Sequence, residues 1–288
     1  MAESNRRWAT RRAVRRLIVS VVKSTALAVK VSRSAGVVAI AAMVATPLFV
    51  QGEVERRWLA YVVVIGFFVA ATAASWLVHD VRAVWAAVVV MTISLAVEVV
   101  GSRTGFPFGD YEYGSALQPK LLGVPLLVAV AWTMITLVVY GMYEHTRLSL
   151  VGRTIAGACS ITAWDVFLDP QMVAEGYWTW QQRGASFRGI PLVNYGGWFI
   201  TAVVMLVLVH MMMTVATGRR AAQQHHDVIQ AEHTARSLAS LMYLVISVLS
   251  TIGFLLFFAD GIVALVGAFA MGSCWTLSRV AAVRRVVS

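Results

Sequence analysis

Residues 58–78 read WLAYVVVIGFFVAATAASWLV, a run of apolar side chains without a single charge. A helix of about 20 apolar residues is long enough to cross the hydrocarbon core of a bilayer. Comparable runs recur along the chain, and they are continuous rather than alternating, which excludes a transmembrane β-barrel. Because backbone N–H and C=O groups find no water inside the bilayer, helices remain the only spanning structure. The sequence therefore predicts an all-α integral membrane protein.

We predict a bundle of about eight transmembrane helices. Seven or nine helices remain possible, because the first run is short and the last contains Gly261, Gly267 and Gly272. We find no internal repeat and no separate soluble domain. The predicted spans are residues 34–50, 58–78, 83–100, 121–143, 151–168, 192–216, 238–258 and 260–278.

Composition supports the same class of protein. Of the 288 residues, 59% are hydrophobic and 13% are charged, whereas a soluble domain carries about 25% charged residues. The net charge of +10 lies mostly at the ends of apolar runs, which argues against nucleic acid as a partner and favours contacts with anionic lipid headgroups. Cys159 and Cys274 both fall inside predicted spans, so neither indicates a disulfide framework or a zinc site.

Positive charge divides the chain into parts and orients it. Residues 1–33 form a basic lead segment, residues 34–280 the membrane domain and residues 281–288 a basic tail. The lead segment is either an amphipathic helix in the membrane interface or a partly disordered tail. Most Lys and Arg residues fall on the side where an eight-span chain places both termini. The positive-inside rule therefore predicts a multi-pass protein of the cell membrane with both termini in the cytoplasm.

Two outer loops differ from the other loops in composition. Residues 101–120 read GSRTGFPFGDYEYGSALQPK, and residues 169–191 read DPQMVAEGYWTWQQRGASFRGIP. Both are rich in aromatic, acidic and glycine residues. Because two predicted spans separate them, they lie on the same side of the membrane. We therefore expect their polar side chains to converge on one site.

Three carboxylates stand at the span ends next to these loops. Glu98 lies near the end of the third span. Asp165 and Asp169 share a helix face near the end of the fifth, and Pro170 is expected to stop that helix. Ionisable groups inside spans are costly and often functional, and paired carboxyl groups in an apolar setting can keep one proton for acid catalysis. Structural roles remain open, since Asp165 could bond a neighbouring helix and Glu98 could pair with Arg103.

Aromatic side chains crowd the same two loops and their flanks. The face of an aromatic ring stabilises a nearby cation, including a developing carbocation. Taken singly, each Tyr or Trp is more simply explained as a membrane-interface residue. The aromatic residues are Phe106, Phe108, Tyr111 and Tyr113 in the first loop, and Trp164, Tyr177, Trp178, Trp180, Tyr195 and Trp198 in and beside the second.

Motifs for metals and cofactors are weak in this chain. His225 and His226, followed by Asp227, Glu232 and His233 in a polar cytoplasmic loop, could bind a metal, although a solvated helix face is the favoured interpretation. No phosphate loop, dinucleotide fingerprint or HExxH motif is present. We therefore predict neither a metal nor a cofactor.

Long segments resemble a known family. Residues 98–134 begin EVVGSRTGFPFGDYEYG, and residues 163–180 read AWDVFLDPQMVAEGYWTW, followed by GIPLVNYGGWF at 189–199. These stretches are similar to the two hallmark segments of the carotenoid biosynthesis membrane proteins, a family that contains the CruF-type carotenoid 1,2-hydratases and the bisanhydrobacterioruberin hydratases. The resemblance covers roughly residues 36–275.

The resemblance implies addition of water across the terminal C1–C2 double bond of a linear carotenoid, lycopene-like or longer, to give a tertiary alcohol. From acidity and placement we expect Asp165 to be the acid and Asp169 or Glu98 to orient the water. Other enzymes of the carotenoid pathway are possible partners. The side chains expected to shape the end-group pocket are Glu112, Tyr113, Trp178 and Asn194, with Arg103 holding a carboxylate in place.

Two alternative functions remain open. A transporter or a lipid-binding membrane module would also explain the spans and their acids, although transporters often contain repeated halves. A membrane prenyltransferase would use an aspartate pair like Asp165 and Asp169 to hold a diphosphate through Mg²⁺. That motif also needs an Asn where Ile161 stands, and Asp110 and Glu112 have the wrong spacing for a second cluster.

Overall fold

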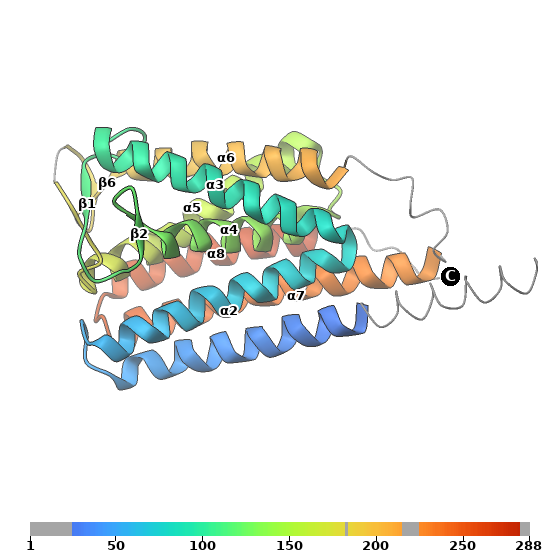
Figure 1. The fold of residues 1–288 in the computed structure, drawn as a ribbon, viewed down its shortest axis with the longest axis horizontal. Coiled ribbons are helices and arrows are strands. Elements are labelled where there is room, and N and C mark those ends of the chain that lie inside the picture. Colours follow the sequence, from blue (N-terminus) through green and yellow to red (C-terminus); the bar gives the residue numbers. More distant parts are fainter. Residues whose placement is uncertain (1–24, 182–183, 215–224, 283–288) are drawn as a thin grey trace, which may run out of the picture.

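The computed structural model describes residues 25–181, 184–214 and 225–282, and these residues form a bundle of helices (Figure 1). The first helix, Thr25–Leu48, ends in the 3-10 turn η1 (Thr46–Leu48) and is called the N-terminal helix below. The others are α2 (Val54–His79), α3 (Val81–Thr104), α4 (Leu126–Tyr143), α5 (Leu150–Ala174), α6 (Leu192–Thr214), α7 (His225–Leu256) and α8 (Gly261–Val280).

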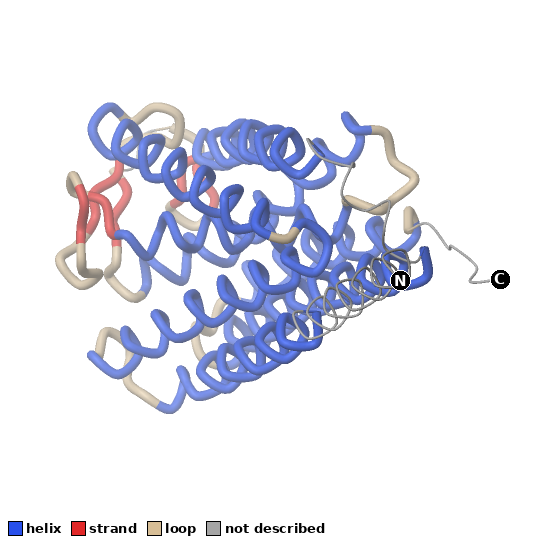
Figure 2. The backbone as a smooth tube through the Cα atoms, turned by 45° about the vertical axis from the view of Figure 1, so that its right-hand side comes forward, coloured by secondary structure: helices blue, strands red, loops and turns tan. Residues whose placement is uncertain are grey.

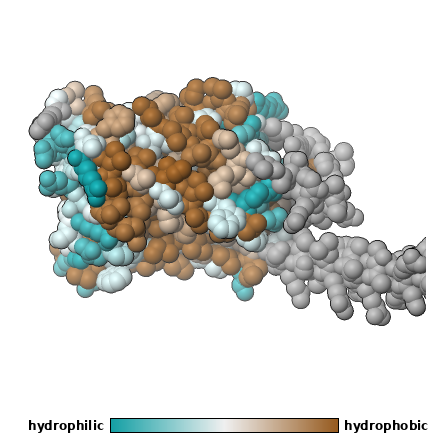
Figure 3. Space-filling model, turned by 45° about the horizontal axis from the view of Figure 1, so that its top comes forward, coloured by the Kyte–Doolittle hydropathy of each residue, from teal (hydrophilic) through white to brown (hydrophobic). Residues whose placement is uncertain are grey.

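Seven helices of the described chain are long and apolar enough to cross a membrane. α5 is the exception, because it carries Arg153, Asp165 and Asp169. Its 25 residues make a helix about 37 Å long, and it packs between α6 and α8. Figure 3 shows an apolar belt on the surface of the bundle, with hydrophilic side chains gathered toward its ends. The prediction of an all-α membrane bundle is confirmed.

Several predicted helix boundaries are wrong, including the start of α7, which lies at His225 and not at residue 238. The N-terminal helix is already formed at Thr25, where the described residues begin, and not at residue 34. Lys30 and Arg33 are exposed on it, and such long side chains can lie along a helix and reach the headgroup layer. α5 continues past Pro170 to Ala174. A proline this near the helix end removes one backbone hydrogen bond, while the N–H of Glu175 still donates to the carbonyl of Gln171 at 3.0 Å.

Short strands join the loops at one end of the bundle (Figure 2). β1 (Tyr111–Tyr113) pairs antiparallel with β4 (Trp178–Trp180), so the two outer loops converge as predicted. β2 (Lys120–Leu121) pairs with β3 (Val124–Pro125), and β5 (Ser186–Phe187) pairs with β6 (Ile190–Pro191). The β2–β3 hairpin delays the start of α4 beyond the predicted residue 121. The described chain starts and ends at the opposite end of the bundle (Figure 1).

The expectation of no internal repeat was also wrong. The order α3, β1, β2–β3 hairpin, α4 recurs as α5, β4, β5–β6 hairpin, α6. Each hairpin turns through a positive-φ residue and a glycine, Leu122–Gly123 in one and Arg188–Gly189 in the other. The sequences GVPLL and GIPLV begin at these turn glycines. Both units cross the bundle in the same direction, because α3 and α5 each lead into a strand at the same end.

Gly197 lets α6 contact the loop before β1. A Cβ atom at this position would lie 2.6 Å from the carbonyl oxygen of Pro107 and 2.8 Å from the ring of Phe108. We expect Gly197→Ala to lower the free energy of unfolding by about 1–3 kcal/mol, measured by thermal unfolding in detergent. Gly196→Ala is the matched control, because a Cβ there meets nothing within 4 Å, and it should unfold at or slightly above the wild-type temperature. Equal losses in both variants would contradict the assigned contact.

Candidate active site

The β1–β4 ladder directs four aromatic side chains into the bundle. Tyr111 is opposite Trp180, and Tyr113 is opposite Trp178. The ring centroids of these pairs are 5.0 and 5.9 Å apart. Successive residues of a strand point to opposite faces, so the middle pair of the ladder points away and is exposed.

The two tyrosines of β1 donate hydrogen bonds to Glu98 on α3. Their hydroxyl groups lie 2.5 Å (Tyr111) and 2.6 Å (Tyr113) from Oε2, and Nε1 of Trp132 on α4 lies 2.8 Å from Oε1. Burial, and then the charge of Glu98, raise the pKa of both tyrosines, so both hydroxyl groups keep their protons. Three donors therefore satisfy the oxygens of a buried carboxyl group.

The two tryptophans of β4 donate to Asp169 on α5. Their Nε1 atoms lie 2.6 Å (Trp178) and 3.1 Å (Trp180) from Oδ1. Nδ2 of Asn194 on α6 lies 2.5 Å from Oδ2 of Asp169 and 2.7 Å from Oδ2 of Asp165. The ladder thus supplies hydrogen-bond donors to one carboxyl group from each repeated unit.

Asp165 and Asp169 form a pair. Nδ2 of Asn194 donates to Oδ2 of both carboxyl groups, which holds them side by side. The buried Oδ1 of Asp165 has no donor among the residues that the structure describes. Two buried carboxyl groups this close repel each other when both are charged, which favours a proton on one of them. The arrangement is therefore suited to holding one shared proton.

Aromatic rings from both repeated units meet beside these carboxyl groups. Trp132 of α4 stacks on Trp198 of α6 with ring centroids 4.0 Å apart and an interplanar angle of 24°. Trp164 meets Trp198 edge-on at 6.0 Å, and Phe108 lies 6.4 Å from Trp132. The faces of such rings attract positive charge.

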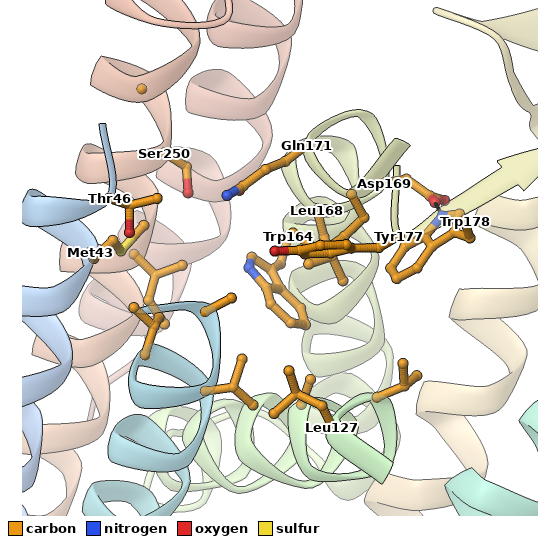
Figure 4. Close-up of a pocket in the computed structure, with 18 of the residues that line it drawn as sticks. Met43, Thr46, Leu127, Trp164, Leu168, Asp169, Gln171, Tyr177, Trp178 and Ser250 are labelled. Atoms are coloured by element: carbon orange, nitrogen blue, oxygen red, sulfur yellow. Dashed lines mark hydrogen bonds between the residues drawn. The ribbon is translucent and has the colours of Figure 1, made fainter. Parts of the chain in front are cut away.

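A cavity of about 380 Å³ reaches these groups. Its walls are mostly apolar side chains of the N-terminal helix, α2, α4, α5 and α7, and its size falls within the range of small-molecule pockets. Glu98, Asp169 and Asn194 line the cavity, whereas Asp165 does not. Figure 4 shows Asp169 on one side of it, and Thr46 and Ser250 on the other.

A buried ion pair lies at the edge of the cavity. Nη2 of Arg56, at the start of α2, bonds Oε1 of Glu175, which follows α5. Nη1 of Arg56 donates to the carbonyl of Phe49 at 3.2 Å, and Oε2 of Glu175 accepts from the N–H of Gly52 at 3.3 Å. The two side chains are only 7% and 3% exposed. The pair therefore ties α2 to α5 beside the cavity.

Two of the predicted site residues lie elsewhere. Glu112 is in the exposed middle pair of the ladder, because alternation along β1 turns it away from its neighbours. Arg103 is exposed and donates to the carbonyl of Leu122 at 3.3 Å, so it does not hold the carboxyl group of Glu98. The other predicted residues, which are Glu98, Tyr113, Asp165, Asp169, Trp178 and Asn194, lie together. The side chains of His225, His226 and Asp227 lie outside the described residues.

The cavity also uses residues that were not predicted. Trp132 lies inside an apolar run and looks like an ordinary spanning residue, although a buried indole N–H needs an acceptor and so signals a polar neighbour. Arg56 looks like a flanking charge at the start of a span. Nothing in the sequence marks its burial against Glu175.

Comparison with known proteins identifies the family. Residues 58–270 match the family model described as carotenoid biosynthesis protein. The chain belongs to this family. The matched range includes both outer loops and every carboxyl group of the site described above.

The chain is also similar to the bisanhydrobacterioruberin hydratase of Haloarcula japonica. It is 34% identical over 134 residues, which are 45% of this chain and 45% of the relative. The alignment thus spans less than half the length of either protein. No solved structure matches the chain.

Proposed function

We propose that this protein is a carotenoid hydratase, which adds water across the terminal C1–C2 double bond of a linear carotenoid to give a tertiary alcohol. The observation that carries the proposal is an apolar cavity, inside a membrane bundle, that ends at Glu98 and Asp169. Apolar walls suit a hydrocarbon substrate, and buried carboxyl groups suit proton transfer. Membership of the carotenoid biosynthesis family and the similarity to a protein named as a hydratase support it.

Protonation is the first step of the proposed reaction. Asp169, which shares a proton with Asp165, donates it to C2 of the substrate. The two π electrons form the new C–H bond and leave a tertiary cation at C1. The stacked rings of Trp132 and Trp198 and the carboxylate of Glu98 stabilise this cation. Asp165 therefore acts through Asp169, since only Asp169 lines the cavity.

Water capture completes the reaction. The oxygen of a water molecule bonds to C1, and Glu98 accepts the proton that this water releases. The proton then returns through water to the aspartate pair. The sum is one alkene and one water giving one alcohol, without transfer of electrons, so the scheme needs neither a nucleotide nor a flavin nor a metal.

The placement of the protein is part of the proposal. The excess of Lys and Arg near the ends of the chain supports a cell-membrane protein with both termini in the cytoplasm. The site would then lie near the outer face, and a membrane-bound pathway of isoprenoid enzymes would supply the carotenoid.

Expression in a host that accumulates a linear carotenoid tests the function. We expect a new pigment that is more polar on chromatography and heavier by one water per hydrated end. The host with an empty vector supplies the control. Unchanged pigment in a host whose membranes contain the protein would contradict the proposal.

A further inference from the structure

One side of the cavity opens among lipid-facing side chains. Four of its apolar lining residues are strongly exposed: Val44 (57%), Ile252 (41%), Leu256 (69%) and Phe257 (53%). Val44 belongs to the N-terminal helix, and the others lie at or just after the end of α7. The cavity is therefore open sideways, between these two segments, at the same end of the bundle as the strands.

The opening faces away from the carboxyl groups. In Figure 4 the N-terminal helix with Met43 and Thr46 lies on the side of the cavity opposite Asp169 and Trp178. A substrate with its reacting end at Asp169 thus points the rest of its chain toward the N-terminal helix and α7. Because the exposed rim is apolar and the surrounding bilayer is hydrocarbon, a hydrocarbon chain crosses it at little cost in hydration free energy.

The volume of the cavity limits what it can enclose. About 380 Å³ is near the lower end of the range for drug-sized ligands, which suffices for an end group but not for a whole linear carotenoid. We propose that only the end group enters the cavity, while the polyene extends between the N-terminal helix and α7 into the bilayer. This inference rests on the proposed function. This side opening, rimmed by Val44, Ile252, Leu256 and Phe257, is the binding surface for the polyene.

The length of the substrate gives the first test of the side opening. Val44→Trp narrows the rim, so we expect kcat/KM for a long linear carotenoid to fall about tenfold, mainly through KM. A short isoprenoid with the same end group fits inside the cavity and should keep kcat/KM within about twofold. Leu265→Trp on α8 is the control, since Leu265 is 72% exposed and does not line the cavity. An equal fall for long and short substrates, or no fall at all, would overturn the proposal.

A second test does not depend on catalysis. In a chain with Cys159→Ala and Cys274→Ala, we introduce Leu256→Cys or Leu265→Cys and measure alkylation by a membrane-permeant maleimide in lipid vesicles. A linear carotenoid in the vesicles should slow alkylation at position 256 several-fold more than at position 265. Equal rates would refute the side opening even if the protein hydrates carotenoids. Protection at position 256 by a protein that hydrates nothing would refute the hydratase and keep the binding surface.

Discussion

Asp169→Asn is expected to lower the rate of carotenoid hydration by about 10²–10⁴-fold, the usual contribution of a positioned acid or base. The variant lacks the carboxyl group that the proposed mechanism uses to protonate the substrate. It keeps the side-chain volume and an oxygen that can accept from Trp178 and Trp180. The protein should therefore still fold and enter the membrane. The measurement is initial rate of product formation by purified protein at matched concentrations.

Glu112→Gln is the control for this change. It removes a carboxyl group from the same ladder, but from the exposed face, so its rate should stay within about twofold of the wild type. If Asp169→Asn retains full activity, the assignment of the acid is wrong. If Glu112→Gln is as inactive as Asp169→Asn, the loss reflects damage to the ladder and not the missing proton.

Breaking the buried ion pair is expected to destabilise the bundle strongly. Arg56→Met or Glu175→Leu leaves the partner charge buried and unpaired, which typically costs about 3–5 kcal/mol of unfolding free energy. The double variant should recover most of this loss, because it leaves no unpaired charge in a site where both side chains are less than a tenth exposed. Denaturant unfolding in detergent micelles, carried out on all four proteins, measures the coupling.

The exposed pair of Arg188 and Asp260 serves as the comparison. The side chain of Arg188 is 45% exposed, and an exposed ion pair usually contributes less than about 1 kcal/mol. Arg188→Gln should therefore unfold close to the wild type. A double variant at Arg56 and Glu175 that is as unstable as the two single losses combined would show that the two side chains act independently.

Much of the fold follows from the apolar runs, because each one can only be a spanning helix. The meeting of the two outer loops also follows from topology, since an even number of spans separates them. Within the site, Asp165 and Asp169 could be predicted to act together because four residues place them on one helix face. Asn194, Tyr113 and Trp178 were expected near the end group, and they reach these carboxyl groups or Glu98.

The remaining features depend on contacts that sequence periodicity does not encode. A strand of three residues is too short to display alternation, so Glu112 looked as favourable as Tyr111 although they point to opposite faces. The continuation of α5 through Pro170 depends on packing around its end. The repeated unit is equally hidden, because its defining strands contain two or three residues.

The repeat changes how the alternative functions are weighed. A lack of repeated halves can no longer count against a transporter. The carboxyl groups that the two repeated units contain favour an enzyme over a transporter. Glu98 and Asp165 stand at the same sequence distance from the strand that follows each of them. The ladder itself donates to Glu98 of the first unit and to Asp169 of the second. Only the second unit adds Asp169, which gives that half a second buried carboxyl group.

The most direct test follows the atoms of water into the product. Purified protein, supplied with a linear carotenoid in lipid and with no other additive, is incubated in water labelled with deuterium and a heavy oxygen isotope. Mass spectrometry should find one solvent oxygen in the new hydroxyl group and one non-exchangeable deuterium on the neighbouring carbon for each hydrated end. An unlabelled hydroxyl oxygen, or unchanged carotenoid in the presence of folded protein, would contradict hydration at this carboxyl site.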